Sequence, residues 1–213
     1  MERRNFTTLV FFDALVLAVF AGLVFLVTSD GPLTVADHFI SFVAPSLWFP
    51  PLSNIMLFFT FLGSTTSIII FSLFVIAYLF SKKRYSAAVF FAAAIFLSYL
   101  LTALLKNGLL IERPLASFVP EGGFSFPSGH ATSSTAFFFS IWFIFFQNVS
   151  SSKIRKLLLF LCFLIPLLIG ASRVYLNVHF ASDILGGFLL GLFSSFFCYI
   201  LWQWSIFLFK KRF

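Results

Sequence analysis

The sequence predicts an all-α, polytopic membrane protein with six transmembrane helices. Two properties of its composition lead to this prediction: 61% of the 213 residues are hydrophobic, and only 10% are charged. An ordinary soluble domain is about 45–50% apolar and about 25% charged. The mean hydropathy is +1.06, and 36 phenylalanines stand against 7 acidic residues. These values exclude a disordered chain and a typical water-soluble fold.

Six apolar runs supply the predicted helices. They are much longer than the roughly ten residues of a barrel strand and do not alternate apolar with polar residues, so strands are a poor alternative. At about 20 residues per span, the chain holds roughly six spans and little else, and residues 1–213 are expected to form a single integral-membrane domain. The runs cover about 7–27, 54–80, 86–105, 131–146, 157–171 and 180–209.

The first and second runs are separated by a segment of a different character. The first run follows Glu2-Arg3-Arg4 but is longer than the apolar part of a signal peptide and lacks a clear cleavage site, so a retained helix is expected. Trp48 and Phe49 then lie among three prolines. Aromatic residues of this kind favour the membrane interface, so we expect this segment to lie along the interface rather than to cross the bilayer.

The basic residues predict the orientation. Six spans place both termini on one side, where 11 of the 14 Lys and Arg residues then fall. The positive-inside rule makes this side cytoplasmic, so a plasma-membrane protein with cytoplasmic termini is expected. The net charge of +7 thus follows from topology and does not indicate nucleic-acid binding, and no obligate protein partner is evident. Only Lys106, Arg113 and Arg173 fall on the extracytoplasmic side.

Those three cations belong to three short polar segments, 106–114, 127–130 and 172–183, which the topology brings to one membrane face. Ionisable groups at membrane depth are costly and usually functional. Two arginines and a lysine can clamp the oxygens of a phosphoryl group. Ser128 and Gly129 stand where a helix begins after Pro127, so their backbone N–H groups and the helix dipole are expected to bind an anion.

Two histidines complete a site for phosphoryl transfer. His179 and Asp183 are four residues apart and share one helix face. A carboxylate on one ring nitrogen fixes the tautomer and leaves the other nitrogen free to attack phosphorus. His130 is then available as the general acid. The fixed cations replace the charge that Mg²⁺ often supplies, and no carboxylate cluster on that face suits a divalent ion. We therefore predict an enzyme with no metal and no cofactor.

The three segments resemble the signature of the type-2 phosphatidic-acid phosphatase family, membrane lipid phosphatases related to vanadium haloperoxidases. That signature has Lys, six residues and Arg-Pro; then Pro-Ser-Gly-His; then Ser-Arg, five residues, His, three residues and Asp. Every position is present here with the right spacing. The resemblance implies a six-helix core and a phosphohistidine intermediate. It assigns the nucleophile to His179, the orienting carboxylate to Asp183, the general acid to His130, and phosphate binding to Lys106, Arg113, Ser128, Gly129 and Arg173.

The expected function is therefore that of an integral-membrane lipid phosphatase. It would hydrolyse a phosphate monoester or pyrophosphate on a lipid, with the site facing outward and with membrane lipids as its surroundings. An outward-facing site favours lipids of the outer leaflet, which in a bacterium points to undecaprenyl pyrophosphate, with phosphatidylglycerol phosphate or phosphatidic acid as alternatives. The chain also resembles small bacterial phosphatidylglycerophosphatase-B-like and undecaprenyl-pyrophosphate phosphatases. A lipid phosphotransferase with a sugar or lipid acceptor is one alternative. A non-enzymatic lipid transporter is another, although the charges gather at one face and no inverted repeat is evident.

Overall fold

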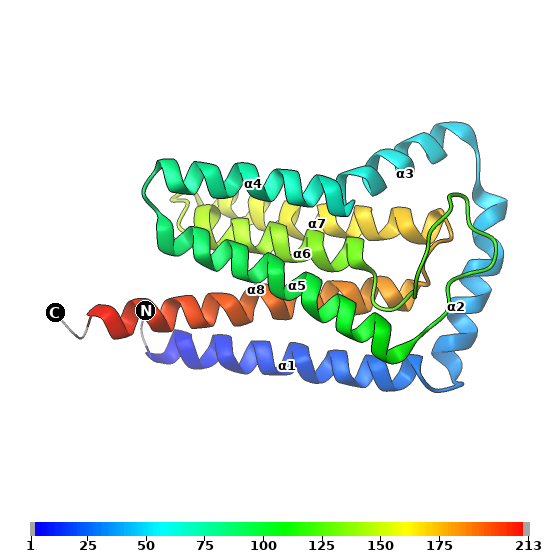
Figure 1. The fold of residues 1–213 in the computed structure, drawn as a ribbon, viewed down its shortest axis with the longest axis horizontal. Coiled ribbons are helices and arrows are strands. Elements are labelled where there is room, and N and C mark those ends of the chain that lie inside the picture. Colours follow the sequence, from blue (N-terminus) through cyan, green and yellow to red (C-terminus); the bar gives the residue numbers. More distant parts are fainter. Residues whose placement is uncertain (1–2, 211–213) are drawn as a thin grey trace.

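The computed structural model describes residues 3–210, and every regular element in that range is a helix, as the composition predicts. Most helices run along the long axis of a bundle, whereas α2 lies across one end of it (Figure 1). In chain order the elements are α1 (Arg3–Val27), α2 (Pro32–Val43), the 3-10 turn η1 (Ala44–Leu47), α3 (Pro50–Leu62), α4 (Thr65–Ser81), α5 (Tyr85–Leu109), α6 (Gly129–Ile141), the π-helical turn η2 (Trp142–Phe146), α7 (Ser152–Tyr175) and α8 (Ala181–Lys210).

Four helices of the described range are long and apolar enough to cross a membrane: α1, α5, α7 and α8. The pair α3 and α4 adds a fifth span if it is counted as one, although it bends by 49°. The single helix predicted over 54–80 is therefore two helices, which meet at Gly63 and Ser64. The Ser64 side chain accepts a hydrogen bond from the backbone N–H of Ser67, which starts α4 as a separate helix.

The run predicted over 131–146 is not among these candidate spans. Its regular part, α6, has 13 residues before the chain enters the π-helical turn. At about 1.5 Å of rise per residue, α6 is about 20 Å long, shorter than the hydrocarbon core of a bilayer at about 30 Å. The sequence thus placed this helix correctly, but the described residues give four or five spans by length and composition instead of six.

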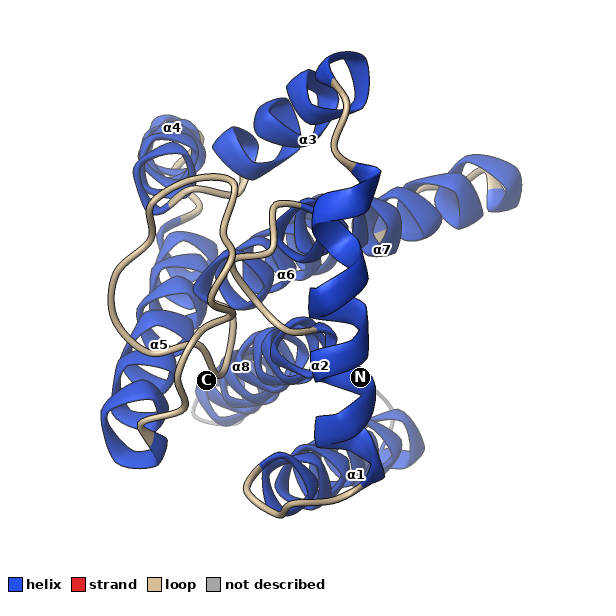
Figure 2. Cartoon of the chain, turned by 90° about the vertical axis from the view of Figure 1, so that its right-hand side faces the viewer, coloured by secondary structure: helices blue, strands red, loops and turns tan. Residues whose placement is uncertain are grey.

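The helix α8 is the centre of the bundle. It packs most extensively on α6 and also contacts α1 and α5, and an end-on view places it among these three helices (Figure 2). Two glycines allow α6 and α8 to approach closely. A Cβ atom on Gly187 would lie 2.6 Å from the carbonyl oxygen of Ser128, and one on Gly191 would lie 2.5 Å from that of Thr132. This contact fixes the start of α6 beside the start of α8.

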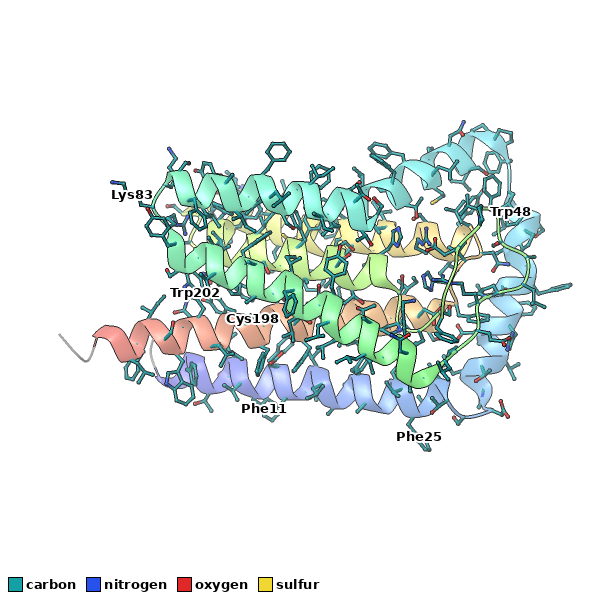
Figure 3. All side chains as sticks on the ribbon, viewed as in Figure 1. Phe11, Phe25, Trp48, Lys83, Cys198 and Trp202 are labelled. Atoms are coloured by element: carbon teal, nitrogen blue, oxygen red, sulfur yellow. The ribbon has the colours of Figure 1, made fainter. Side chains whose placement is uncertain are left out.

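The outer surface of the bundle carries large apolar side chains. Phe11 and Phe25 of α1 point away from the other helices (Figure 3) and are 69% and 71% exposed. Phe91 is fully buried, and Cys198 is nearly so. Large apolar side chains that are exposed on the outside of the bundle suit a protein whose solvent is lipid, as expected for an integral membrane protein.

The two ends of the bundle differ in chemistry. The start of α1, the end of α8 and the turn between α4 and α5 lie at one end, and α2 lies at the other, next to the loop that follows α5 (Figure 1). The basic turn Lys82–Arg84 therefore lies at the end remote from α2. Lys211 and Arg212, which the predicted orientation also uses, lie outside the described residues.

Candidate active site

The three predicted segments meet at the end of the bundle that α2 crosses. Each contributes from the end of a helix or from the adjoining loop, because the helices that carry them start or stop at that end. Lys106 lies in the last turn of α5, Arg113 in the following loop, Ser128, Gly129 and His130 at the start of α6, Arg173 in the last turn of α7, His179 in the turn to α8, and Asp183 in the first turn of α8.

The turn between α7 and α8 is fixed by local hydrogen bonds. The backbone N–H of Val178 donates to the carbonyl of Arg173 at 3.1 Å. Asn177 has a φ of 51°, a left-handed conformation that Asn tolerates better than most residues. Its side-chain amide donates to the carbonyls of Ser41 and Ala116, at 3.1 and 2.7 Å. These contacts hold the turn against α2 and against the loop between α5 and α6. The turn in this way positions His179.

His179 is held in one tautomer. Its Nε2 lies 3.1 Å from Nη1 of Arg113, and since a guanidinium can only donate, Nε2 must be the acceptor. Nδ1 then carries the proton and donates to Oδ2 of Asp183 at 3.1 Å. Burial and the charges of Arg113, Arg173 and Lys106 hold the pKa of His179 well below its usual value. The imidazole is therefore neutral, with the lone pair of Nε2 directed toward the arginine.

Ser125 supports the same carboxylate. Its hydroxyl donates to Oδ2 of Asp183, because an ionised carboxylate only accepts. Oγ of Ser125 also lies 3.2 Å from Nδ1 of His179. Oδ2 of Asp183 also accepts from the backbone N–H of Phe180 at 2.8 Å. Ser125, His179 and Asp183 are almost fully buried, so this network is shielded from water.

Arg173 and Arg113 face a second acidic residue of the site, Glu121. Nη1 of Arg173 donates to the hydroxyl of Thr60 at 2.6 Å, and Nη2 pairs with the carboxylate of Glu121. Nη2 of Arg113 lies 3.9 Å from the other oxygen of that carboxylate. Burial is the largest single influence and raises the pKa of Glu121, but the charge and hydrogen bond of Arg173 together with the charge of Arg113 outweigh it, so the pKa is below the usual value. Glu121 is therefore ionised and lies between the two arginines.

Two of the remaining phosphate-binding candidates, Lys106 and the backbone N–H of Ser128, already donate hydrogen bonds within the protein. Lys106 donates from Nζ to the carbonyls of Phe124 and Ser125, and so holds the loop before α6. The backbone N–H of Ser128 was expected to bind an anion but donates to the carbonyl of Asp183 at 3.0 Å. That expectation is wrong, because the close packing of α6 on α8 uses the group. The hydroxyl of Ser128 is buried without a partner.

His130 lies within electrostatic reach of the same cluster. Its ring interacts electrostatically with four site residues, namely Arg173, His179, Glu121 and Arg113. No hydrogen bond of its ring is found within the described residues, and the side chain is only partly buried. A group placed this way beside His179 can reach a molecule bound between the two histidines.

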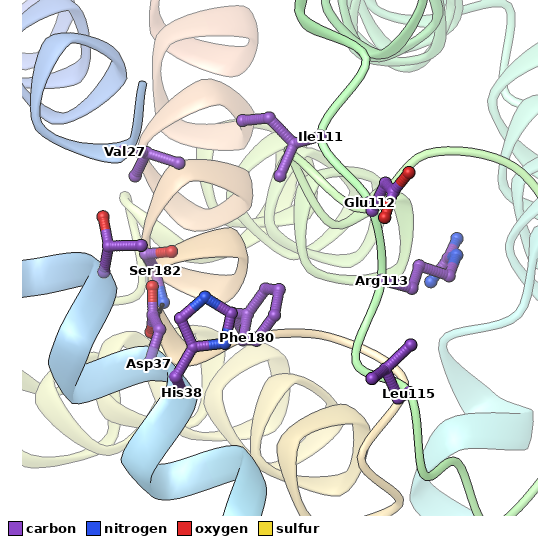
Figure 4. A pocket seen from close by; sticks show the side chains of 10 residues that line it. Val27, Asp37, His38, Ile111, Glu112, Arg113, Leu115, Phe180 and Ser182 are labelled. Atoms are coloured by element: carbon purple, nitrogen blue, oxygen red, sulfur yellow. Dashed lines mark hydrogen bonds between the residues drawn. The ribbon is translucent and has the colours of Figure 1, made fainter. Parts of the chain in front are cut away.

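Two cavities flank Arg113 on its outer side. One has a volume of about 310 Å³ and the other about 280 Å³, and both are lined by His38, Arg113, Leu115 and Phe180. The close view of the larger cavity shows His38 and Asp37 of α2 on one side and Arg113 on the other (Figure 4). Asp37 also accepts from the backbone N–H of Ser182 at 3.1 Å, which ties α2 to the start of α8. The cavities give Arg113 an open approach.

Comparison with known proteins agrees with this geometry. The PAP2 superfamily pattern matches residues 87–207, more than half of the chain and all of the predicted site segments. The chain belongs to the PAP2 superfamily. Phosphatidylglycerophosphatase B of Bacillus subtilis (strain 168) is 33% identical over 159 residues, which are 74% of this chain and 78% of that protein. The resemblance to type-2 phosphatidic-acid phosphatases is confirmed, and the protein is a membrane lipid phosphatase.

Two solved structures share the fold. The transmembrane PAP2-type phosphatidylglycerolphosphate phosphatase from Bacillus subtilis superimposes with a TM-score of 0.80 at 29% identity, covering 88% of this chain and 94% of that chain. Aquifex aeolicus LpxE superimposes with a TM-score of 0.61 at 22% identity, covering 81% of this chain and 98% of that one. The second likeness concerns the fold alone.

The sequence analysis missed three residues of this PAP2 site. Ser125 and Glu121 lie outside the recognised motifs, and Thr60 lies on α3, over 100 residues from Arg173 in the chain. A signal existed only for Glu121, a carboxylate in the loop between two of the predicted site segments. A lone serine or threonine carries no comparable signal, because its role depends on the side chain that packs against it.

Proposed function

We propose that this PAP2 enzyme hydrolyses a phosphate monoester or pyrophosphate on a membrane lipid through a phosphohistidine intermediate. The observation that carries the proposal is the pairing of His179 with its two neighbours: Nδ1 with Asp183 at 3.1 Å, and Nε2 with Arg113 at 3.1 Å. A buried neutral imidazole, fixed by a carboxylate and directed at a guanidinium, is suited to attack an anion that the guanidinium holds.

In the first step, the lone pair of Nε2 of His179 attacks phosphorus while the bond from phosphorus to the lipid oxygen breaks. His130, which is protonated when the anionic substrate lies beside it and offsets the neighbouring cations, gives its proton to that oxygen, so the lipid leaves as a neutral alcohol, or as a phosphate from a pyrophosphate. The phosphorylated imidazole keeps its proton on Nδ1, and Asp183 compensates the resulting positive charge. Arg113 and Arg173 neutralise the equatorial oxygens in the transition state.

In the second step, His130 is neutral and removes a proton from a water molecule. The oxygen of that water attacks phosphorus, the bond to Nε2 breaks, and inorganic phosphate leaves. His130 has then regained its proton, and His179 is again neutral. Residues Lys106, Ser128 and Gly129 are proposed to surround the phosphate with Arg113 and Arg173. For Ser128, the buried hydroxyl without a partner supports this role.

The proposed substrate is a phosphorylated glycerolipid, with phosphatidylglycerol phosphate first. Two Bacillus subtilis relatives support this choice by their names: phosphatidylglycerophosphatase B and a PAP2-type phosphatidylglycerolphosphate phosphatase. Each comparison covers most of both chains. Undecaprenyl pyrophosphate and phosphatidic acid are the further candidates, since both present a terminal phosphate at the membrane surface. The chain has no soluble domain of its own in the described range that would lift a lipid out of the bilayer.

Phosphate release by purified protein in detergent tests this function. We expect release from phosphatidylglycerol phosphate without any acceptor, undiminished by EDTA, because the described residues neutralise the phosphoryl charge with Arg and Lys. Undecaprenyl pyrophosphate and phosphatidic acid form the comparison panel. Phosphate transfer only in the presence of an added alcohol would indicate a phosphotransferase, and activity abolished by EDTA and restored by Mg²⁺ would contradict the metal-free mechanism.

We also propose that the whole chain, residues 1–213, works as one domain of six membrane crossings, with the bent pair α3 and α4 as one crossing and α6 with its π-helical turn as another. A core shared by α1, α4, α5, α6 and α8 supports one domain. The basic turn Lys82–Arg84, remote from α2, supports a cytoplasmic location for that end and an extracytoplasmic site in the plasma membrane.

Cysteine labelling in intact cells tests this orientation. After both native cysteines, which are buried, are replaced, a membrane-impermeant maleimide is expected to label a cysteine at Gly122 but not one at Lys153. Permeabilised cells serve as the control, since both positions should then react. Labelling of position 153 alone in intact cells would reverse the proposed orientation.

A further inference from the structure

Glu121 occupies the place where the proposed mechanism needs a phosphate. Its carboxylate pairs with Nη2 of Arg173 and lies 3.9 Å from Nη2 of Arg113. Both guanidiniums belong to the motifs that the PAP2 resemblance assigns to phosphate. A carboxylate and a phosphoryl group are both anions that accept from guanidinium N–H groups. The two arginines therefore already bind an anion, and that anion belongs to the chain itself.

The donors of Arg173 show what a phosphate would have to share. Nη1 is engaged by Thr60, and Nη2 by Glu121. Nε is buried and has no partner among the described residues. A phosphate can take Nε without disturbing a contact, but the paired contact made by the neighbouring Nε and Nη2 groups also uses Nη2, which Glu121 engages. Two anions held by one guanidinium also repel each other, so full binding of phosphate and the pairing of Glu121 oppose one another.

Glu121 is placed to leave without unfolding the site. Its side chain is 31% exposed, whereas that of Arg173 is 3% exposed. Water can therefore solvate the displaced carboxylate. Nε of Arg113 donates to the carbonyls of Gly122 and Gly123, at 3.2 and 2.9 Å. This contact holds the backbone beside Glu121, so a rotation of the side chain is enough to clear the arginines.

We propose that Glu121 is a displaceable internal anion, which occupies the phosphate site between turnovers and competes with product phosphate for Arg113 and Arg173. The inference rests on the proposed function, since it needs these arginines to bind the phosphoryl group. Phosphate binds fully only in the fraction of molecules in which Glu121 has left the arginines. The apparent dissociation constant of phosphate is therefore its intrinsic constant divided by that fraction. Glu121 thus acts as a positioning residue that favours release of inorganic phosphate.

The test is inhibition by inorganic phosphate of lipid phosphate hydrolysis. In Glu121→Gln the competing charge is removed at nearly constant size, and we expect the inhibition constant of phosphate to fall about tenfold, or about 1.4 kcal/mol. KM for the lipid should fall as well, while kcat does not rise. A matched loss of one exposed carboxylate from the same end, Asp30→Asn, should leave the inhibition constant unchanged, which separates local competition from a general change in surface charge.

The direction of the change distinguishes competition from a structural role. If Glu121 only holds the arginines in place, its loss weakens phosphate binding, and a raised or unchanged inhibition constant in an active Glu121→Gln enzyme overturns the inference. Glu121→Asp keeps the charge with a shorter reach and should give an intermediate constant. If both variants fail to fold, the ion pair is structural and the inference is wrong. Failure of the wild-type enzyme to release phosphate would instead reject the proposed function.

Discussion

Replacing His179 by alanine is expected to abolish phosphate release, with a loss of at least about 10³-fold, because among the described residues no other imidazole is hydrogen-bonded to the arginine pair. Removal of a nucleophile from a preorganised site leaves only the contributions of binding and charge stabilisation. The substitution creates a small buried cavity next to Asp183 and Arg113, so folding must be checked by thermal denaturation. Steady-state release of phosphate from phosphatidylglycerol phosphate is the measurement.

A rapid acid-free quench gives the sharper readout for this variant. The wild-type enzyme mixed with substrate labelled on phosphorus should carry label in an acid-labile, base-stable form typical of phosphohistidine, and His179→Ala should carry none. His38→Ala is the matched control, because it removes an exposed imidazole from the same end of the bundle, where its ring packs edge-to-face against Phe180. Label on folded His179→Ala protein, or turnover near the wild-type rate, would refute the nucleophile.

Replacing Asp183 by asparagine is expected to lower kcat by about 10³ to 10⁴-fold. The same change in a Ser-His-Asp triad costs about 10⁴-fold, because the amide stabilises the wrong histidine tautomer. Here the amide can donate to Nδ1 of His179, which moves the ring proton to Nε2 and removes the attacking lone pair. The position of the ring need not change, so KM is expected to vary far less than kcat. Steady-state kinetics on the folded variant separate the two constants.

Ser125→Ala is the comparison for Asp183→Asn. It removes one donor from the carboxylate but leaves the contact between Asp183 and His179 in place. We therefore expect a loss of only about ten- to a hundredfold, in line with about 1.5–3 kcal/mol for one hydrogen bond to a charged group. If Asp183→Asn loses no more activity than Ser125→Ala, the carboxylate does not control the tautomer, and the assigned role of Asp183 fails.

Much of the fold could be predicted from the sequence, since apolar runs report directly on the environment of a helix. The errors concern helix continuity. The run over 54–80 contains Gly63 and Ser64, and only the structure shows that the chain bends there by 49°. The helix near 131–146 is interrupted by a π-helical turn. Hydropathy does not register such breaks, because a bend between two apolar helices leaves the composition unchanged.

The sequence by itself determined the membrane class, the order of the helices and the three motifs, because composition and spacing along the chain carry that information. Tertiary structure decided which groups remain free to act. Packing of α6 on α8 directs the N–H of Ser128 to Asp183, and the loop before α6 brings Glu121 to Arg173. Such contacts join residues about 50 positions apart, and their partners follow from how the helices pack, which no local pattern records.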